Sequence, residues 1–310
     1  MAILITGASG FVGSALIPKL LEKGHKVYAL SRHPPEAADG LIPLVGDVTQ
    51  RNLGLIEMKP LKDITAVYHL AGIHSLRQED KDGSIWKTNV EGTRNVLEFC
   101  LKHDIPKLYF TSSAYSWRVN PYGRSKIENE GDIEAFAKEF GLKATILKPS
   151  VIMGTLEHPY PGHFSRFVSA IIQIHHRAEL IRRKIEDSLR LPVIEPLFRI
   201  KGNPEGRLNL VKVAGVAWGM ANIEEPGTFW LTNPAPPTLQ QLADWISEVI
   251  MVRMKFEPKF KPTPIEATFQ KMVAPFGPYL QGDNFPSNLQ LSPPVDKAFI
   301  QETVKGIVLD

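Results

Sequence analysis

The sequence has little of what marks a secreted, metal-binding or membrane protein. Cys100 is the single cysteine among 310 residues, which excludes a disulfide within the chain and a cysteine-rich metal site. Long apolar runs, runs of one charge and internal repeats are missing, and 36 basic against 33 acidic residues leave a formal net charge of +3. We therefore expect a cytoplasmic protein with no integral membrane segment and no nucleic-acid partner.

The first half of the chain alternates short apolar segments with longer amphipathic ones. The apolar segments have the length of buried strands, and the stretches 13–24, 84–103 and 122–141 have helical spacing. This alternation predicts an α/β fold with a doubly wound parallel sheet. The expected strands are Ala2 to Thr6, Lys26 to Ser31, Leu41 to Val45, Ala66 to Leu70, Lys107 to Thr111 and Ala144 to Lys148.

After Pro149 the pattern becomes irregular and prolines concentrate. A strand and helix pattern returns at about 207–232, which suggests that this segment rejoins the sheet. We predict a first domain of residues 1–152 that is completed by about 207–232. Residues 153–206 and 233–310 would form a smaller, irregular and discontinuous C-terminal domain that binds the substrate.

Gly7, Gly10 and Gly13 directly follow the first predicted strand, at the mouth of the first predicted helix. Glycines there allow a tight turn and a close approach to a pyrophosphate, which a helix N-terminus attracts. Glycine spacing alone also occurs in ordinary turns, but its place between strand and helix favours dinucleotide binding. The first domain is thus predicted to be a Rossmann domain.

The end of the second predicted strand bears on the choice of dinucleotide. An acidic side chain there would bind the ribose hydroxyls of NAD, but this chain has Ser31, Arg32 and His33. A hydroxyl and a guanidinium suit a 2′-phosphate, so NADP(H) is favoured over NAD(H); the alternative for Arg32 is a solvated surface charge. Asp47, after the third predicted strand, is a candidate for the adenine amino group.

Tyr122 and Lys126 lie one turn apart on the same face of a predicted helix. A phenol titrates at about pH 10 in water, and an adjacent ammonium stabilises its phenolate. Carbonyl reduction and alcohol oxidation need such an acid-base group. The alternative is a chance pair on a surface helix.

The order of several motifs is more specific than any one of them. TGASGFVG, HLAG, TNVEGT, TSSA, YGRSK and LKPSVIMG succeed one another in a way that resembles the extended short-chain dehydrogenase/reductase superfamily. The resemblance implies that Ser113 binds the substrate carbonyl, Tyr122 transfers the proton and Lys126 lowers the pKa of the tyrosine. Asn89 would anchor a water that relays protons to Lys126, which also holds the nicotinamide ribose.

The resemblance also implies cofactor contacts on the glycine loop and at the ends of the strands. They are Thr6, Gly7, Ser9, Gly10, Phe11, Val12, Gly13, Ser31, Arg32, His33, Asp47, Val48, Leu70, Ala71, Gly72, Lys126, Pro149, Ser150 and Val151. The candidate substrate contacts are Tyr115, Trp117 and Met153.

Segments outside the shared core are similar to the fatty acyl-CoA reductase and thioester-reductase branch. They are GDVTQRNLGL, GNPEGRLNLVKV and APFGPYLQGDNFPSNLQL. The resemblance implies hydride attack on a thioester carbonyl, an oxyanion stabilised by Ser113 and Tyr122, and loss of the thiol to leave an aldehyde. The small-molecule substrate would be presented on coenzyme A or a carrier protein. Ala214 and Gly215 depart from the branch, which usually has an aspartate-tyrosine pair at this helix start.

Three further features have simpler interpretations. The stretch from His163 predicts an amphipathic helix with a solvated basic face, or else a lid that covers an acyl chain. His175 and His176 are adjacent and point to different sides of that helix, so no metal site is predicted. Cys100 lies in an apolar run and is predicted to pack in the core.

Three functions remain open. The leading hypothesis is an NADPH-dependent reductase of an acyl thioester or its aldehyde. The second is an epimerase, dehydratase or ketone reductase that acts on a nucleotide sugar or hydroxy-ketone. The third is a non-catalytic NADP-binding sensor or scaffold, and the intact catalytic set argues against it. A homodimer is compatible with each.

Ser113 and Tyr122 are separated by a short segment. Nine extended residues span about 30 Å, so the spacing does not prevent a shared site. Asn120 as N-cap and Pro121 in the first turn would start the tyrosine helix, which leaves 114–119 as a connecting loop. Many relatives have a longer excursion here, so we expect a pocket that is more open on this side, or one walled by Tyr115, Trp117 and the proline-rich half.

Overall fold

The computed structural model describes residues 1–55, 61, 63–76, 78–117, 120–155, 157–160, 162–190, 197–287, 291 and 294–309. The chain forms two compact units. The first consists of Met1–Ile152, Val213–Thr232 and Pro286–Pro293, and the second of Met153–Lys212, Asn233–Phe285 and Pro294–Asp310. The segment that returns to the first unit therefore begins at Val213, a few residues later than the sequence suggested.

The first unit contains a seven-stranded sheet with the strand order β10-β6-β5-β4-β1-β2-β3, and all neighbouring strands are parallel. The chain builds one half of the sheet outward from β1 and then crosses to build the other half from β4. This confirms the predicted doubly wound sheet, and the strand order reverses between β1 and β4. The strands are β1 (Ala2–Thr6), β2 (Lys26–Ser31), β3 (Leu41–Val45), β4 (Ile64–His69), β5 (Lys107–Thr111), β6 (Lys143–Pro149) and β10 (Gly227–Leu231).

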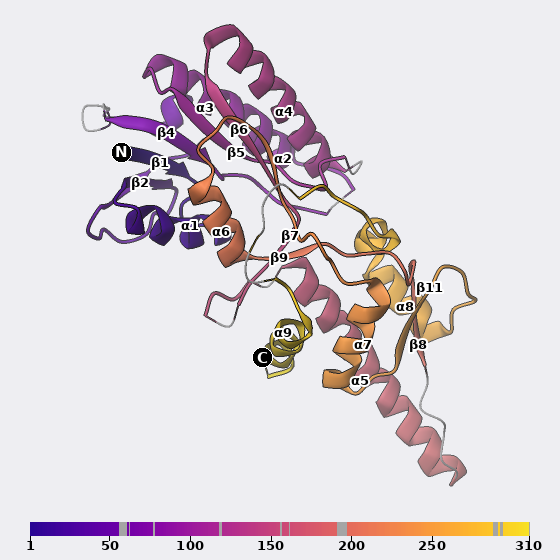
Figure 1. The fold of residues 1–310 in the computed structure, drawn as a ribbon. Coiled ribbons are helices and arrows are strands. Elements are labelled where there is room, and N and C mark those ends of the chain that lie inside the picture. The colour runs from indigo at the N-terminus through magenta and orange to yellow at the C-terminus, as the bar shows by residue number, and fades with distance from the viewer. Residues whose placement is uncertain are drawn as a thin grey trace. The chain divides into compact units, whose positions relative to one another are not determined.

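Helices cover both faces of this sheet. On one face α1 packs against α6, and on the other α3 and its preceding turn η3 pack against α4 (Figure 1). The elements are α1 (Phe11–Glu22), η1 (Arg51–Gly54), α2 (Ser84–Trp86), η3 (Lys87–Glu91), α3 (Gly92–Lys102), α4 (Pro121–Phe140) and α6 (Val213–Asn222). The one helix predicted over 84–103 is thus interrupted by the π-helical turn η3, a feature that is frequent at functional sites.

The core of the first unit lies between the sheet and these helices. All five residues of β1 are buried, as expected of a central parallel strand with both faces covered. Cys100 is 1% exposed within the main apolar cluster, and burial raises the pKa of its thiol to about 12. The prediction that Cys100 packs in the core is therefore confirmed.

Helix α6 forms although Ala214 and Gly215 replace the residues usual at its start. It begins at Val213. Lys23 Nζ donates to the carbonyl of Ala221 at 2.8 Å, and the Tyr68 hydroxyl donates to the carbonyl of Met220 at 3.1 Å. These bonds satisfy carbonyls of the last turn, which have no partners within a helix.

The second unit combines helices with a small parallel sheet of β8 and β11. Helices α7 and α8 each begin with a capping box, at Thr238 and Thr263. The amphipathic helix predicted from His163 is α5. The elements are α5 (His163–Leu189), β8 (Phe198–Lys201), β9 (Leu210–Lys212), α7 (Leu239–Ile250), β11 (Met254–Glu257), α8 (Pro264–Met272), η4 (Ala274–Gln281) and α9 (Lys297–Leu309), and β7 (Val151–Met153) spans the boundary between the units.

A buried carboxylate joins β8 to α8 in the second unit. Glu266 is 3% exposed, and its two oxygens accept bonds from Arg199 Nε and Nη2, both at 2.9 Å. The backbone amides of Arg199 and Thr263 also donate to it, at 3.0 and 2.8 Å. Burial acts to raise the pKa of Glu266, but these hydrogen bonds outweigh it, and the pKa falls below its ordinary value.

Across the described residues, no helix is both long and apolar enough to cross a lipid bilayer.

Candidate functional site

The glycine loop after β1 is shaped by close contacts between backbones. Gly7 has a φ of +72°, and a Cβ there would lie 2.7 Å from the amide nitrogen of Ala71. A Cβ on Gly13 would lie 2.5 Å from the carbonyl oxygen of Gly7. Glycine is therefore required at both positions.

The exposed part of this loop leads into the N-terminus of α1. Ser9 and Gly10 are exposed, and Gly10 is the N-cap residue of the helix that begins with Phe11 and Val12. The loop leads into a helix N-terminus, and Gly10 places no side chain in front of it. This geometry fits a pyrophosphate.

The end of β2 lies beside this loop. Ala8 N donates to the carbonyl of Leu30 at 3.3 Å. Ser31 is 9% exposed, and its Oγ is buried without a hydrogen-bond partner among the described residues. Arg32 and His33, which follow, are exposed. One buried hydroxyl and two exposed basic side chains thus stand at the position where a dinucleotide ribose would lie.

The predicted adenine contacts follow β3. One carboxylate oxygen of Asp47 accepts from the amide and the hydroxyl of Thr49, both at 2.9 Å. Val48 is buried under α3, where a Cβ on Gly92 would lie 3.0 Å from its Cγ2. Asp47 therefore shapes its own turn, and its role toward adenine stays a prediction.

The segment Leu70–Gly72 continues β4 between the glycine loop and the catalytic end. Leu70 N donates to the carbonyl of Thr6 at 3.1 Å. Gly72 is exposed, and a Cβ on it would lie 3.3 Å from Asn89 Oδ1 and 3.8 Å from Lys126 Nζ. A Cβ here would be tight against Asn89 and in ordinary contact with Lys126, so the segment lies directly beside both groups.

Helix α4 holds Tyr122 and Lys126 on one face. Asn120 is the N-cap, its side chain accepts from Gly123 N at 2.7 Å, and Pro121 stands in the first turn, as predicted. Lys126 Nζ lies 5.6 Å from the centre of the Tyr122 ring. The structure therefore brings the predicted acid-base pair together.

Lys126 is a buried cation with few partners. It is 6% exposed, and its Nζ donates to the carbonyl of Thr111 at 2.6 Å. The ammonium also lies 4.7 Å from the centre of the Phe110 ring. Burial lowers the pKa of Lys126 to about 8, although the carboxylate of Glu130 acts in the opposite direction.

The serine segment follows β5, whose last residue, Thr111, binds Lys126. Ser113 is 8% exposed, and its Oγ accepts from Tyr115 N at 3.1 Å. That bond uses a lone pair and leaves the hydroxyl proton for donation. Tyr115 is buried and Trp117 is 49% exposed. Arg118 and Val119, at the end of the predicted connecting loop, lie outside the described residues.

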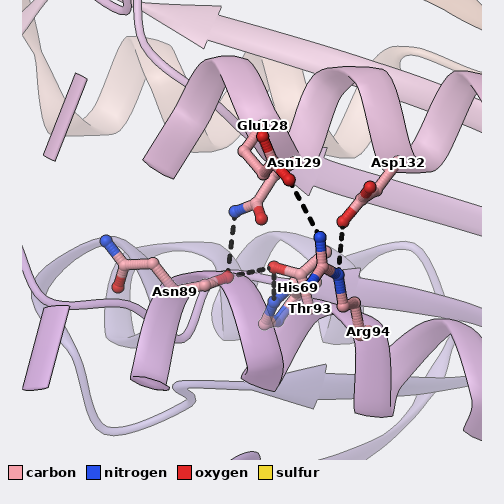
Figure 2. A network of polar contacts seen from close by, with 7 residues as sticks. All are labelled: His69, Asn89, Thr93, Arg94, Glu128, Asn129 and Asp132. Atoms are coloured by element: carbon pink, nitrogen blue, oxygen red, sulfur yellow. Dashed lines mark hydrogen bonds and ion pairs between the residues drawn. The ribbon is translucent and has the colours of Figure 1, made fainter. Parts of the chain in front are cut away.

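Asn89 lies in the π-helical turn η3 and is 1% exposed. Its Oδ1 accepts from Ile73 N at 2.7 Å, and its Nδ2 donates to the carbonyl of Ile73 at 3.1 Å and to Ser125 Oγ at 2.9 Å. The Asn89 carbonyl accepts from Asn129 Nδ2 at 2.9 Å (Figure 2). Asn89 therefore ties the segment after β4 to α4.

The remaining predicted contacts lie at the end of β6 and beyond. Pro149 and Ser150 are buried, and Ser150 Oγ has no partner among the described residues. Val151 is half-buried, whereas Met153 is buried and belongs to the second unit. No group of three or more His, Cys, Asp or Glu among the described residues could hold a metal ion.

The sequence matches the profile of the NAD dependent epimerase/dehydratase family over residues 3–186, more than half of the chain. The chain belongs to this family. Its members are nicotinamide-dependent enzymes, and the match spans the glycine loop, Asn89, Ser113, Tyr122 and Lys126.

Curated relatives fall within the same extended superfamily. A putative UDP-glucose 4-epimerase of Methanocaldococcus jannaschii is 30% identical over 195 residues, which cover 55% of this chain and 63% of that protein. A dihydroflavonol 4-reductase of Gerbera hybrida is 33% identical over 125 residues, 36% of this chain and 33% of that protein. The chain thus spans less than two thirds of the length of these relatives.

Solved structures share the fold of the whole chain. The terminal R domain of the myxalamid PKS-NRPS biosynthetic pathway superposes with a TM-score of 0.75 at 18% identity, covering 99% of this chain and 90% of that one. A UDP-glucose 4-epimerase of Thermotoga maritima, solved with UDP-glucose, has a TM-score of 0.69 at 20% identity and is covered completely, as is this chain. Similarity at this level of identity establishes the fold.

Several residues that surround the predicted catalytic residues were missed from the sequence. Ser125 accepts from Asn89, and the ring of His74 packs against that of Tyr122 with centres 4.6 Å apart and planes tilted by 58°. The Ser112 hydroxyl donates to Glu130, whose other oxygen pairs with Lys148 at 2.8 Å. Glu130 stands one helical turn after Lys126, so the spacing of α4 contained a signal for it.

Proposed function

We propose that this member of the epimerase/dehydratase family is an NADPH-dependent oxidoreductase that reduces an acyl thioester or the derived aldehyde. The observation that carries the reaction type is the buried ammonium of Lys126 beside Tyr122. An ammonium in this position stabilises a phenolate, which makes Tyr122 a usable proton donor near neutral pH.

The residues around the glycine loop fit a nicotinamide dinucleotide. Gly7 and Gly13 allow the tight turn into α1, where a helix N-terminus would attract the pyrophosphate, and the exposed Arg32 supplies a cation at the end of β2. The buried hydroxyl of Ser31 has an unused hydrogen bond, which a 2′-phosphate would satisfy. These features support NADPH over NADH. When bound, the dinucleotide would supply the hydride.

The catalytic end would handle the oxygen of the reacting carbonyl. Ser113 donates its hydroxyl proton as a hydrogen bond to that oxygen, and Tyr122 transfers its proton to it as negative charge develops. Lys126, held by the Thr111 carbonyl, stabilises the phenolate that remains. Loss of the thiol from the resulting hemithioacetal would leave an aldehyde.

The thioester substrate is supported by two observations. Segments such as GDVTQRNLGL and GNPEGRLNLVKV are similar to the thioester-reductase branch, and the R domain of the myxalamid pathway shares the fold over nearly the whole chain. An acyl group on coenzyme A or a carrier protein is therefore the proposed substrate.

A second candidate is favoured by sequence identity. The Methanocaldococcus relative is named a putative UDP-glucose 4-epimerase, and it matches at 30% identity. An epimerase would oxidise and re-reduce a nucleotide sugar with no net use of the cofactor. The same Tyr122 and Lys126 serve both reactions, so the distinction lies in the substrate.

A substrate screen with purified protein would separate the candidates. Oxidation of NADPH and NADH is followed with acyl-coenzyme A of increasing chain length and with aldehydes, and mass spectrometry identifies the products. UDP-glucose is incubated in parallel with NAD and examined for UDP-galactose. We expect thioester-dependent oxidation of NADPH and no sugar conversion; sugar conversion without thioester reduction would overturn the proposal.

Two variants test the roles of the residues. Tyr122→Phe should lower turnover about 10³-fold while NADPH still binds. Arg32→Ala should weaken NADPH about tenfold and leave NADH unchanged, because it removes one charge-assisted contact. Equal losses for NADPH and NADH would contradict the assignment of Arg32.

A further inference from the structure

A line of buried hydrogen bonds runs from the end of β1, just before the glycine loop, to Asn89. Thr6 Oγ1 lies 2.7 Å from His69 Nδ1, and His69 Nε2 lies 3.0 Å from Thr93 Oγ1. The hydroxyl of Thr93 donates to the carbonyl of Asn89 at 2.5 Å (Figure 2). Thr6, His69 and Thr93 are each at most 1% exposed. Bulk water therefore does not replace these bonds.

The segment after β4 closes this line into a circuit. The side chain of Asn89 binds both the amide and the carbonyl of Ile73, at 2.7 and 3.1 Å. Two residues earlier, Ala71 N donates back to Thr6 Oγ1 at 3.4 Å. The circuit thus passes through Gly72, whose Cβ position faces Lys126 Nζ at 3.8 Å.

The direction of each bond follows from the donors available. A backbone carbonyl only accepts, so the one proton of Thr93 points to Asn89. Thr93 Oγ1 must then accept from His69, which places the imidazole proton on Nε2 and leaves Nδ1 to accept from Thr6. Thr6 Oγ1 in turn accepts from Ala71 N. Every member has one assigned role, and the imidazole is a neutral Nε2–H tautomer.

The surroundings of His69 keep it neutral. Burial lowers its pKa to about 3, and the positive charge of Lys126 acts in the same direction. The imidazole therefore stays neutral at physiological pH and does not transfer protons. It orients its two hydroxyl partners.

Asn89 has little hydrogen-bonding capacity left within this circuit. Its carbonyl accepts from Thr93 and from Asn129 Nδ2, which fills both lone pairs. Its amide donates both protons, to Ile73 and Ser125. These contacts suit a group that fixes the segment beside Lys126 better than one that anchors a relay water.

We propose that His69 and Thr93 are positioning residues, which hold Asn89 and the segment Ala71–Ile73 in one rigid frame with the glycine loop. Their effect on cofactor affinity rests on the proposed dinucleotide site. The circuit itself can be tested without a cofactor, because its tautomer is observable in the protein alone.

The test compares two buried threonines of the first unit. Thr93→Val removes the hydroxyl between His69 and Asn89 without changing the shape of the side chain. Thr145→Val is the control, because Thr145 is 2% exposed and donates to the carbonyl of Glu225 at 3.1 Å outside the circuit. We expect similar falls in melting temperature, but only Thr93→Val should raise the dissociation constant for NADPH, by about tenfold. Thr93→Ser should restore it.

Nitrogen NMR of His69 provides the second readout. The protein without cofactor should show a neutral Nε2–H imidazole from pH 5 to 8. A titrating imidazole or the Nδ1–H tautomer would overturn the circuit, as would equal effects of Thr93→Val and Thr145→Val on NADPH binding. If the unmodified protein binds neither NADPH nor NADH, the proposed function fails, and the imidazole spectrum still decides the circuit.

Discussion

Two buried charges, one in each unit, are held in opposite ways. Glu266 of the second unit is surrounded by donors and faces the guanidinium of Arg199, so its pKa falls and its charged form is favoured. Lys126 of the first unit donates to one carbonyl, and none of the ion pairs found among the described residues includes it. Burial therefore lowers its pKa and disfavours its charged form.

This difference separates the structural charge of Glu266 from the charge of Lys126, to which we assign a role in the proposed reaction. A satisfied carboxylate holds β8 to α8, and nothing in that arrangement requires it to change its state. An under-compensated ammonium raises the free energy of the folded protein, and under the proposed function it would stabilise a phenolate beside it. The buried ammonium of Lys126 thus lowers the stability of the folded first unit, whereas the buried carboxylate of Glu266 does not lower that of the second.

The largest effect is expected when the charge of Lys126 is removed. Lys126→Met keeps the length of the side chain, and without the ammonium the phenolate of Tyr122 loses its stabilisation. Turnover of the substrate identified by the screen should fall about 10³-fold. Lys138→Met, an exposed lysine of the same helix, is the control and should retain activity. Retention of activity by Lys126→Met would contradict its role.

The same variant should show how stability depends on pH. The pKa of Lys126 is about 8 in the folded protein against 10.5 in an ordinary lysine. The unfolded chain therefore binds more protons between these values, and the contribution of Lys126 to the free energy of unfolding rises with pH there. Relative to wild type, Lys126→Met should be most stable below pH 8, by about 3 kcal/mol, and should lose this advantage by about pH 10.5.

Chemical unfolding of both proteins from pH 6 to 11 would measure this difference. A constant difference across the range would show that the ammonium carries no penalty in the folded state.

Glu266→Gln should have the reverse pattern. The variant loses the countercharge of Arg199 and at least one accepted bond, so the free energy of unfolding should fall by about 2 kcal/mol. The folded pKa of Glu266 lies below its ordinary value, so this contribution is present at neutral pH and is lost as pH falls through the folded pKa. The variant and wild type should converge in acid. The affinity for NADPH should not change, because the proposed NADPH site lies in the first unit and Glu266 lies in the second.

Local rules explain which features were predictable. Apolar runs identified the strands because buried parallel strands are continuously apolar. Asn120 and Pro121 marked the start of α4 because capping depends on adjacent residues. The glycine loop was recognisable because glycine is required at Gly13 by contacts within one strand-loop-helix unit. Only the contact between Gly7 and Ala71 comes from a distant part of the chain.

Other features depend on pairs that no local pattern records. Thr6 and His69 are 63 positions apart, and Arg199 and Glu266 are 67 apart. The apolar spacing around Asn89 is helical and predicts a continuous helix, whereas the π-helical turn there is held by side chains of α4 and by the backbone of Ile73 after β4. Tertiary contacts of this kind decide the geometry of the site.

The smallest effect is expected on the surface of the same helix pair. Arg94 of α3 pairs with Asp132 at 2.7 Å and Glu128 at 2.9 Å on α4, beside the buried bond from Asn129 to Asn89 (Figure 2). The Arg94 side chain is 45% exposed, so solvent screens it, and Arg94→Gln should cost less than about 1 kcal/mol. Asn129→Leu leaves a buried carbonyl with one donor fewer, so it should lower the free energy of unfolding by more.

Added salt should reduce the loss of unfolding free energy caused by Arg94→Gln and leave the loss caused by Asn129→Leu unchanged, because only Arg94 makes an exposed charge interaction. If the surface variant proved the more damaging of the two, the helices would be joined chiefly by their ion pairs.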